Sequence, residues 1–451
     1  MKISAVILAA GQGTRMRSDL PKVLHPLVGR PMAWHALQAA RQVTGSQPVM
    51  VIGHGAEAVR QALGEEAASY VVQDPQLGTG HAVMQAEPLL RGASDLVLVT
   101  YADMPLVRSE TLRQLVAAHQ DYPAAVTLMT VIAADPRGFG RILRSASGQV
   151  QAIVEEAQAT PEQLAIRELN ASVYCFSAEW LWPALGRIPL SPKGEYYLTD
   201  LVGLAVADGL PVRALLAEDP AEMIGVNTRV HLAEAEAQLR RRINQEWMLQ
   251  GVTMINPDAT YIEPGVTIGR DTLLWPDTYL HGETHIGAGC ELGPNTIIHD
   301  SQVGEQCTIL ASVLEGALLE DHVEVGPFAR LRKGAHLAQG VHMGNFGEIK
   351  NSYLGPGAKM GHFSYLGDAT IGAQVNIGAG TITCNYDGTH KHPTEVGEGA
   401  FIGSDTMLVA PVKVGEGART GAGAVVTRDI PPFSLAVGVP ARVIRKLERS
   451  E

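Results

Sequence analysis

In the second half of the chain, a large apolar residue returns at every sixth position, and a glycine often follows it. A helix does not produce this spacing, because six residues at about 3.6 per turn carry the side chain around the helix axis. An ordinary strand alternates with a period of two and carries no regular glycine. Short strands that turn at each glycine, three to a triangular coil, place these apolar residues in one central column. The pattern predicts a parallel β-helix of hexapeptide repeats, whereas a β-sandwich would give irregular spacings of about 8–12 residues.

The repeat is interrupted in places. A one-residue slip follows its first run, and a longer break follows Ile377 before the repeat resumes. Each inward Ile, Leu or Val contributes roughly 1.5–3 kcal/mol on burial, so no single coil decides stability. The apolar positions are Ile262, Ile268, Leu274, Leu280, Ile286, Leu292, Ile298, Val325, Leu331, Leu337, Met343, Ile349, Leu354, Met360, Leu366, Val396, Ile402, Leu408 and Val414.

The first half has a different pattern, in which apolar strands alternate with helical stretches. Residues 3–10 form a continuous apolar strand, residues 31–42 a helix, and further strands follow at 49–52, 70–73, 96–100 and 125–132. This alternation predicts an α/β, Rossmann-like domain with a mostly parallel sheet. Ligands of such sheets bind at the carboxyl ends of the strands.

An apolar stripe at helical spacing runs over residues 228–249, between the two patterns. It predicts one long helix that Asn227 or Thr228 can cap. The sequence therefore divides into an N-terminal domain over 1–227, a linker helix over 228–250 and a β-helix over 251–451.

Charge and composition exclude several classes of partner. The 451 residues carry a net charge of −12 and no block of Lys or Arg, which argues against nucleic acid and anionic membranes as partners. No apolar run is long enough to span a bilayer, and the run over 3–10 is too short for a signal-peptide core. The four cysteines show no paired spacing and are interpreted as reduced thiols. A cytoplasmic protein is expected.

The turn after the first strand carries candidate phosphate-binding chemistry. Gly11 and Gly13 let backbone N–H groups approach phosphate oxygens, and Arg15 and Lys22 add positive charge. The dinucleotide-binding fingerprint fails, because Met16 stands where a third glycine is needed. For the two glycines alone a plain turn is an equally good interpretation, and Arg15 and Lys22 favour the phosphate site.

This turn, LAAGQGTR followed by Pro21-Lys22, resembles the signature of sugar-phosphate nucleotidyltransferases, and later segments match that family in order. The resemblance implies that Arg15 and Lys22 are catalytic and that Asp103 and Asn227 bind Mg²⁺, a hard cation suited to oxygen ligands. It further implies that UTP or UDP-N-acetylglucosamine is bound by Leu8, Ala9, Ala10, Gly11, Lys22, Gln73, Gly78, Thr79, Tyr101, Asp103, Gly138, Glu155, Asn170 and Asn227.

Loops that leave the repeat carry a second set of polar residues. The stretches GHFSYLGD and GAGTITCNYDG, together with LAAGQGTR, resemble the bacterial bifunctional N-acetylglucosamine-1-phosphate uridyltransferase/glucosamine-1-phosphate N-acetyltransferase family over residues 3 to about 437. The family β-helix is left-handed and forms homotrimers with an acetyltransferase site between chains. Acetyl transfer needs a base for the amine, and histidine titrates nearest to neutral pH. The resemblance assigns this role to His362.

The same resemblance assigns the residues that bind the two substrates of the acetyltransferase site. It implies that glucosamine 1-phosphate is bound by Arg332, Lys350, Tyr365 and Asn376. It implies that acetyl-CoA is bound by Ala379, Asn385, Tyr386, Ser404 and Ala422, with Asn385 and Tyr386 also positioning the amino sugar.

One segment departs from the family pattern. Family members carry an arginine that contacts coenzyme A within a Ser-Arg-Val-Pro stretch, and here residues 437–440 read Val-Gly-Val-Pro. Arg442 and Arg445 are the candidate replacements.

Two alternatives to a bifunctional enzyme remain at this stage. In the first, the chain is a nucleotidyltransferase whose β-helix only forms oligomers. In the second, it is a sugar-nucleotide sensor without turnover, against which Arg15, Lys22 and Asp103 argue.

Overall fold

The computed structural model describes residues 1–133, 135–136 and 138–448. The chain folds into two compact units, Met1–Leu239 and Arg240–Glu451. Their boundary lies within a helix, α9 (Arg229–Leu249), whereas the sequence-based division treats residues 228–250 as a separate linker; that division stays a prediction. Within the described residues, no helix is both long and apolar enough to cross a bilayer.

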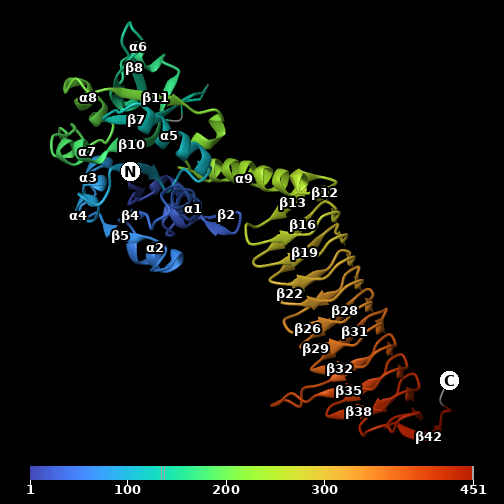
Figure 1. The fold of residues 1–451 in the computed structure, drawn as a ribbon. Coiled ribbons are helices and arrows are strands. Elements are labelled where there is room, and N and C mark those ends of the chain that lie inside the picture. Colours follow the sequence, from blue (N-terminus) through green and yellow to red (C-terminus); the bar gives the residue numbers. More distant parts are fainter. Residues whose placement is uncertain (134, 137, 449–451) are drawn as a thin grey trace. The chain divides into compact units, whose positions relative to one another are not determined.

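The first unit is built on a mixed, mostly parallel sheet with the strand order β11-β7-β10-β6-β1-β4-β5 (Figure 1). β1 lies parallel between β4 and β6, and β10 runs antiparallel to β6 and β7. The predicted strands are confirmed with small shifts at their ends. The bounds are β1 (Ile3–Ala9), β4 (Val49–Ile52), β5 (Ser69–Val72), β6 (Leu96–Tyr101), β7 (Val126–Ile132), β8 (Arg141–Arg144), β9 (Val150–Val154), β10 (Glu168–Ser177) and β11 (Val212–Leu216), with the hairpin β2 (Pro26–Leu27) and β3 (Arg30–Pro31).

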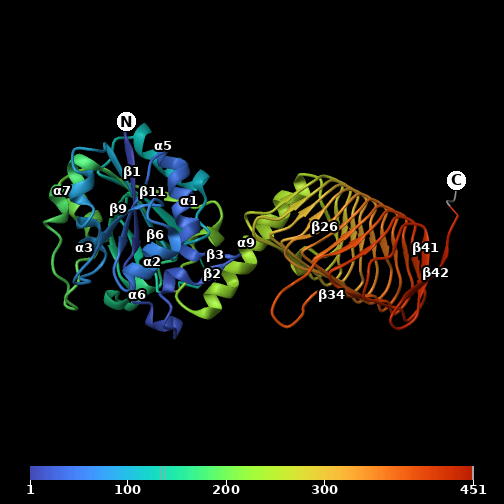
Figure 2. The same ribbon diagram turned by 90° about the horizontal axis from the view of Figure 1, so that it is seen from below.

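Helices cover both faces of this sheet because side chains of β1 alternate between two cores. Ala5, Ile7 and Ala9 pack with α1 and α5 in one core, whereas Val6 and Leu8 pack with α3, α7 and α8 in the other. Figure 2 shows α1 and α5 on one side of the strands and α3 and α7 on the opposite side. The bounds are α1 (Met32–Thr44), α2 (Ala56–Leu63), α3 (Thr79–Met84), α4 (Glu87–Leu90), α5 (Ser109–Asp121), α6 (Pro161–Leu164), α7 (Ala178–Leu185) and α8 (Asp200–Ala207).

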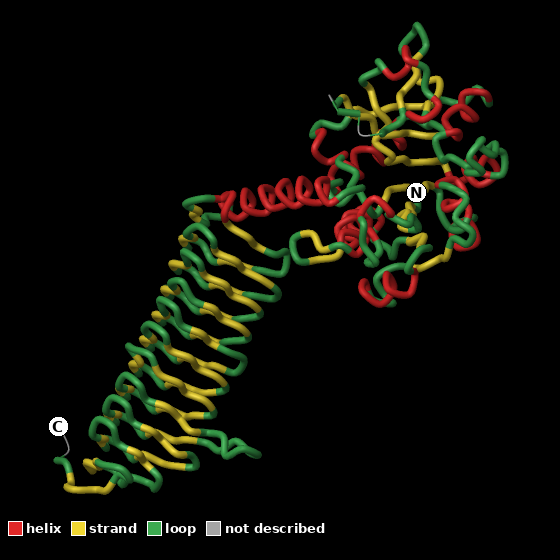
Figure 3. The backbone as a smooth tube through the Cα atoms, turned by 180° about the vertical axis from the view of Figure 1, so that it is seen from behind, coloured by secondary structure: helices red, strands yellow, loops and turns green. Residues whose placement is uncertain are grey.

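The second unit is a parallel β-helix, as the six-residue repeat predicts. Short strands stack in register into three sheets, with loops at the corners of each coil (Figure 3). Leu280 pairs with Ile298, and Leu331 with Ile349, and all four side chains are fully buried in the central column. The predicted inward positions are therefore confirmed.

The interval between Ile298 and Val325 corrects one detail of the sequence interpretation. Instead of one slip, several steps are one residue shorter than six, and the column continues through Val303, Ile309, Leu314 and Leu319, all of which are buried. The shorter steps turn at corners where residues such as Asp300 and Ala311 adopt left-handed backbone conformations.

The strands of the three sheets have the following bounds. The first sheet contains β12 (Thr253–Met254), β15 (Leu273–Leu274), β18 (Glu291–Leu292), β21 (Thr308–Ile309), β24 (Glu324–Val325), β27 (His342–Met343), β30 (Lys359–Met360), β33 (Asn376–Ile377), β36 (Phe401–Ile402), β39 (Arg419–Thr420), β41 (Ser434–Val437) and β42 (Arg442–Lys446). The second contains β13 (Thr260–Ile262), β16 (Thr278–His281), β19 (Thr296–His299), β22 (Val313–Glu315), β25 (Arg330–Leu331), β28 (Gly347–Lys350), β31 (Ser364–Gly367), β34 (Ile382–Cys384), β37 (Met407–Val409) and β40 (Val425–Val426). The third contains β14 (Thr267–Ile268), β17 (His285–Ile286), β20 (Gln302–Val303), β23 (Leu318–Leu319), β26 (Ala335–Leu337), β29 (Ser352–Leu354), β32 (Ala369–Ile371), β35 (Thr394–Val396) and β38 (Val412–Val414).

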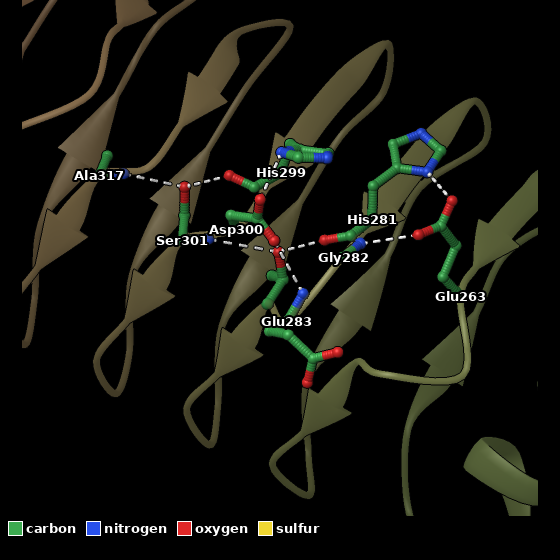
Figure 4. A network of polar contacts seen from close by, with 9 residues as sticks. Glu263, His281, Gly282, Glu283, His299, Asp300, Ser301 and Ala317 are labelled. Atoms are coloured by element: carbon green, nitrogen blue, oxygen red, sulfur yellow. Dashed lines mark hydrogen bonds and ion pairs between the residues drawn. The ribbon is translucent and has the colours of Figure 1, made fainter. Parts of the chain in front are cut away.

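Polar side chains link neighbouring coils at the corners (Figure 4). The Glu263 carboxylate accepts hydrogen bonds from the backbone N–H of Gly282 at 2.7 Å and from Nδ1 of His281 at 2.9 Å. The Asp300 carboxylate accepts from the backbone N–H of Glu283 at 2.9 Å. These bonds satisfy backbone groups that turn away from the sheets, so each corner is fixed by the coil next to it.

Helix α9 belongs to both units through one apolar stripe. Thr228 accepts a hydrogen bond from the backbone N–H of His231 at 3.2 Å, as expected of a capping residue. Leu232 and Leu239 pack in the first unit, and Trp247 packs against the β-helix core. The predicted helix is confirmed.

Candidate functional sites

A cleft of about 930 Å³ lies at the carboxyl ends of β1 and β6, where the α/β fold predicts a ligand. Its lining brings together segments far apart in the sequence. Of the residues that the sequence predicts to bind the nucleotide, the cleft is lined by Leu8, Ala9, Ala10, Gly11, Lys22, Gln73, Gly78, Thr79, Tyr101 and Asp103. The lining residues do not include Arg15, Gly138, Glu155, Asn170 and Asn227.

The two glycines of the glycine-rich turn differ in how strictly their positions require glycine. Gly13 has φ +64°, and a Cβ there would lie 2.5 Å from Cβ of Lys22, so this position requires glycine. A Cβ on Gly11 would meet no atom within 4 Å, so Gly11 leaves open space at the mouth of the cleft. Arg15, in the exposed 3₁₀ turn Thr14–Met16, is accessible to solvent beside it.

Two oxygen ligands face one ammonium group at the end of β6. Lys22 forms an ion pair with Asp103, and its Nζ lies 3.2 Å from Oδ1 of Asn227. The backbone N–H of Val226 donates to the carbonyl of Asp103 at 2.8 Å, which brings Asn227 beside Asp103 although they are distant in sequence. Within the described part of the chain, no group of three or more His, Cys, Asp or Glu could hold a metal. One carboxylate and one amide oxygen suit Mg²⁺, which takes few protein ligands and completes its shell with water and phosphate oxygens.

The loop over 76–80 is held by a segment that the sequence interpretation missed. The backbone N–H of Tyr196 donates to the carbonyl of Leu77 at 2.8 Å, and the carbonyl of Tyr196 accepts from Gly80 at 2.8 Å. A Cβ on Gly78 would lie 2.7 Å from that carbonyl, at φ +94°, so only glycine fits there. Gln73 donates from Nε2 to the carbonyl of Gly78 at 2.9 Å.

The same segment contacts Glu155, another residue that the sequence predicts to bind the nucleotide sugar. The Thr199 hydroxyl donates a hydrogen bond to Oε1 of Glu155 at 2.8 Å. Burial raises the pKa of the Tyr101 phenol well above its ordinary value, and Glu155 and Asp103 add to that rise, so Tyr101 stays a neutral donor. Asn170 is buried, and its Nδ2 donates to the Tyr174 hydroxyl at 2.7 Å. Residues 195–199 therefore link the loop over 76–80 to Glu155.

A positively charged corner lies on the second unit, at the end of β28. The pKa of the Lys350 ammonium is lowered, first by a hydrogen bond with Lys391 and then by the positive charge of Lys391. The charge of Arg332 lowers this pKa further. Arg332 also pairs with Glu348 at 2.9 Å. The structure thus brings the predicted Arg332 and Lys350 together and adds Lys391, which lies in a loop without the repeat and gave no signal in the sequence.

That loop leaves the coil stack between β34 and β35 (Figure 2). Tyr386 pairs with Lys391 across it. The backbone N–H of His390 and then the His392 side chain hold the pKa of the Asp387 carboxyl well below its usual range. At the base of the loop, Nδ2 of Asn385 donates to Oδ2 of Asp368 at 2.5 Å. Asn385 is therefore positioned beside the corner that carries Lys350.

A second group forms a column on the corner between the first and second sheets. His362 lies in the turn after β30, and Ala379, Ser404 and Ala422 occupy the equivalent turns of the next three coils. Backbone hydrogen bonds connect these turns from coil to coil, from Gly380 to Phe363 at 2.7 Å, from Asp405 to Ala379 at 2.6 Å and from Gly423 to Ser404 at 2.8 Å.

The His362 imidazole is exposed and makes no hydrogen bond or ion pair with the described residues. Of the predicted sugar ligands, Tyr365 lies on the second sheet and Asn376 on the first, so this corner separates them. Among the described residues, no side-chain hydrogen bond or ion pair joins His362 to Arg332, Lys350 or Lys391.

Fold and site together define a nucleotidyltransferase domain joined to a hexapeptide-repeat transferase domain. Residues 5–175 match the model of the MobA-like NTP transferase domain, and residues 265–300 and 393–428 match the bacterial transferase hexapeptide repeat. The chain is 50% identical to the bifunctional protein GlmU of Heliobacterium modesticaldum, over 97% of this chain and 95% of that protein. It is 49% identical to the bifunctional protein GlmU of Trichlorobacter lovleyi, over 96% of this chain and 95% of that one. The chain belongs to the GlmU family of bifunctional transferases.

Proposed function

We propose that this chain makes UDP-N-acetylglucosamine in two steps. The β-helix unit transfers an acetyl group from acetyl-CoA to glucosamine 1-phosphate. The α/β unit then joins N-acetylglucosamine 1-phosphate to UTP and releases pyrophosphate. The conjunction of the Lys22–Asp103–Asn227 cluster with the His362 column on the same chain carries this proposal.

In the uridylyl step the chain has to bring two polyanions together. Gly11 leaves room for the triphosphate, and Lys22 and the exposed Arg15 stabilise charge on it. The residues that would hold Mg²⁺ are Asp103 and Asn227, and the ion supplies positive charge where phosphate oxygens converge. Glu155, held by Thr199, and Asn170 bind the sugar hydroxyls and the N-acetyl group.

In the acetyl step the sugar amine attacks the thioester carbonyl. Lys350, Arg332 and Lys391 bind the sugar phosphate, and Tyr365, Asn376 and Asn385 position the sugar. His362 accepts the proton of the attacking amine, the C–S bond breaks, and coenzyme A leaves as its thiol. Ala379, Tyr386, Ser404 and Ala422 line the path of the coenzyme.

The assembly we propose is a homotrimer, supported by an exposed aromatic ladder at the same corner. Phe328, Phe346 and Phe363 are 60%, 61% and 55% exposed on successive coils, and the first two rings stack at 5.5 Å. Phe328 and Phe346 also have φ of 61° and 56°, a left-handed conformation that costs bulky residues energy. Burial of each ring against a second copy contributes about 1.5–3 kcal/mol.

A coupled assay with glucosamine 1-phosphate, acetyl-CoA and UTP tests the function. The complete mixture should release coenzyme A and pyrophosphate and yield UDP-N-acetylglucosamine. With N-acetylglucosamine 1-phosphate and UTP alone, pyrophosphate release should continue. If pyrophosphate is released only with the acetylated sugar, and coenzyme A never appears, the β-helix serves oligomerisation alone and the acetyltransferase half of the proposal is wrong.

A further inference from the structure

Because the family arginine is absent from the C-terminal turn, the coenzyme phosphates need another cation near the His362 column. Gly438 occupies the position of that arginine, and no side chain there can bind a phosphate. Any replacement must lie along the line of His362, Ala379, Ser404 and Ala422, because the proposed coenzyme follows this line.

A second column runs beside the first, on the outer face of the first sheet. Lys359 pairs with Asn376, Asn376 with Phe401, Phe401 with Arg419, and Arg419 with Leu435. Each of the first four residues precedes a turn residue of the His362 column by three positions, on the same coil. Arg419 therefore shares its coil with Ala422, and Phe401 shares its coil with Ser404.

We propose that Arg419, together with Arg445, binds the phosphate groups of acetyl-CoA in place of the family arginine. The inference rests on the proposed acetyl transfer at His362. Phe401, 47% exposed and one coil before Arg419, would cover the dimethyl segment of the pantetheine arm.

The reach of the coenzyme fits this assignment. Stacked strands lie about 4.8 Å apart, so the three coil steps from His362 to Ala422 span roughly 14 Å. The pantetheine arm between the thioester and the diphosphate has about the length of four extended residues, or roughly 15 Å. With the thioester at His362, the diphosphate therefore lies at the coil of Arg419.

Arg445 lies beyond Arg419 on the same face. It pairs with Leu435 across the antiparallel strands β41 and β42, and Leu435 pairs with Arg419. The order Arg419, Leu435, Arg445 places a second cation further along the coenzyme, where its 3′-phosphate follows the diphosphate.

The charges of these two arginines are available for a ligand. Among the residues that the structure describes, the guanidinium groups of Arg419 and Arg445 make no hydrogen bond or ion pair, and both side chains are exposed. Arg442, the other candidate from the sequence, donates from Nη1 to the carbonyl of Ala441 at 3.2 Å and pairs with Val437 instead. The geometry thus favours Arg445 over Arg442.

The test measures acetyl transfer by the full-length protein at varied acetyl-CoA. A charged hydrogen bond to phosphate is lost in Arg419→Ala, so the KM for acetyl-CoA should rise about 10- to 100-fold while kcat stays within about twofold. Arg445→Ala should raise the KM less, Arg419→Lys should recover part of the loss, and Arg442→Ala should change it little. Arg428→Ala is the matched control, since Arg428 is an exposed arginine outside the column.

S-acetylpantetheine, which lacks the phosphates beyond the arm, separates phosphate binding from a structural effect. With this substrate, wild-type protein and Arg419→Ala should have equal kcat/KM. The inference is overturned if Arg419→Ala leaves the KM for acetyl-CoA within about twofold of wild type, or if it lowers kcat/KM equally for both substrates. Failure of the wild-type protein itself to release coenzyme A would instead refute the acetyltransferase function and this inference with it.

Discussion

Replacement of Asp103 by asparagine isolates the charge at the centre of the nucleotidyltransferase cleft. Asn keeps the shape of Asp, and the carbonyl of Asp103 still accepts the hydrogen bond from Val226 that positions Asn227. What changes is the carboxylate, which pairs with Lys22 and supplies one of the two proposed oxygens for Mg²⁺. The fold of the cleft should therefore persist while its cation chemistry fails.

The magnitude follows from the surroundings of the carboxylate. Lys22 and Asp103 side chains are 12% and 21% exposed. Two unit charges about 4 Å apart attract each other by about 4 kcal/mol in a medium with an effective dielectric constant near 20, and partial exposure lowers the net value of the pair. Loss of the charge that binds the metal removes about 3–5 kcal/mol of transition-state stabilisation, or roughly two to four orders of magnitude in rate.

Both activities are measured on one sample, pyrophosphate release for uridylyl transfer and coenzyme A release for acetyl transfer. Asp103→Asn should lose the first by at least about 100-fold and keep the second. The matched control is Asp95→Asn, at the opposite end of β6, where the carboxylate accepts from the backbone N–H of Lys2 at 2.6 Å, far from the cleft. If Asp103→Asn keeps more than about a tenth of its uridylyl transfer at the same Mg²⁺ concentration, the assignment of Asp103 as a metal ligand is wrong.

Four further substitutions test separate parts of the structure. His362→Ala should slow acetyl transfer by about 10²- to 10⁴-fold and leave uridylyl transfer unchanged, and a loss below about tenfold would show that another group accepts the proton. Thr199→Val removes the hydrogen bond to Glu155 and should raise the KM for N-acetylglucosamine 1-phosphate about tenfold without raising that for UTP, while Thr199→Ser should behave as wild type. Phe346→Glu should lower the molar mass seen by light scattering to that of a monomer, and an intact trimer would place the interface elsewhere. Ile349→Ala leaves a cavity in the fully buried column and should lower the free energy of unfolding of the β-helix unit by about 2–5 kcal/mol in a denaturant titration, with uridylyl transfer as its internal control.

The sequence predicts the β-helix well because every coil needs apolar side chains at regularly spaced inward positions. Every coil needs an inward side chain such as Leu331 or Ile349, so the pattern survives even where single steps shorten, as between Ile298 and Val303. The α/β unit is less fully predicted. Its pattern identifies β1, β4, β5, β6 and β7 but not β8 to β11, and the antiparallel placement of β10 between β6 and β7 follows only from the structure.

The residues of the candidate sites also differ in how far the sequence could predict them. Residues within recognisable motifs, such as Asp103, Lys22 and His362, could be named as candidates from the sequence, and their chemical roles stay predictions. Lys391 and the segment 195–199 could not, because they act through tertiary contacts: Lys391 approaches Lys350 only when its loop folds back, and Thr199 meets Glu155 only through the fold of the domain. Such groups carry no local pattern of their own.

The regular stack explains how distant residues form one site despite loops of unequal length. The loop over 385–392 lengthens one coil, yet Asn376 still pairs with Phe401 and Ile371 with Val396, so the column continues undisturbed on the far side. Position along a column is therefore set by the number of coils and not by distance in the sequence. For acetyl-CoA with its reactive end at His362, as we propose, each further coil would lie about 4.8 Å further along the coenzyme. On such a scaffold a binding residue can be exchanged for one on a neighbouring coil or column without any change of fold, and the exchange that we propose, of a C-terminal arginine for Arg419 and Arg445, is a change of this kind.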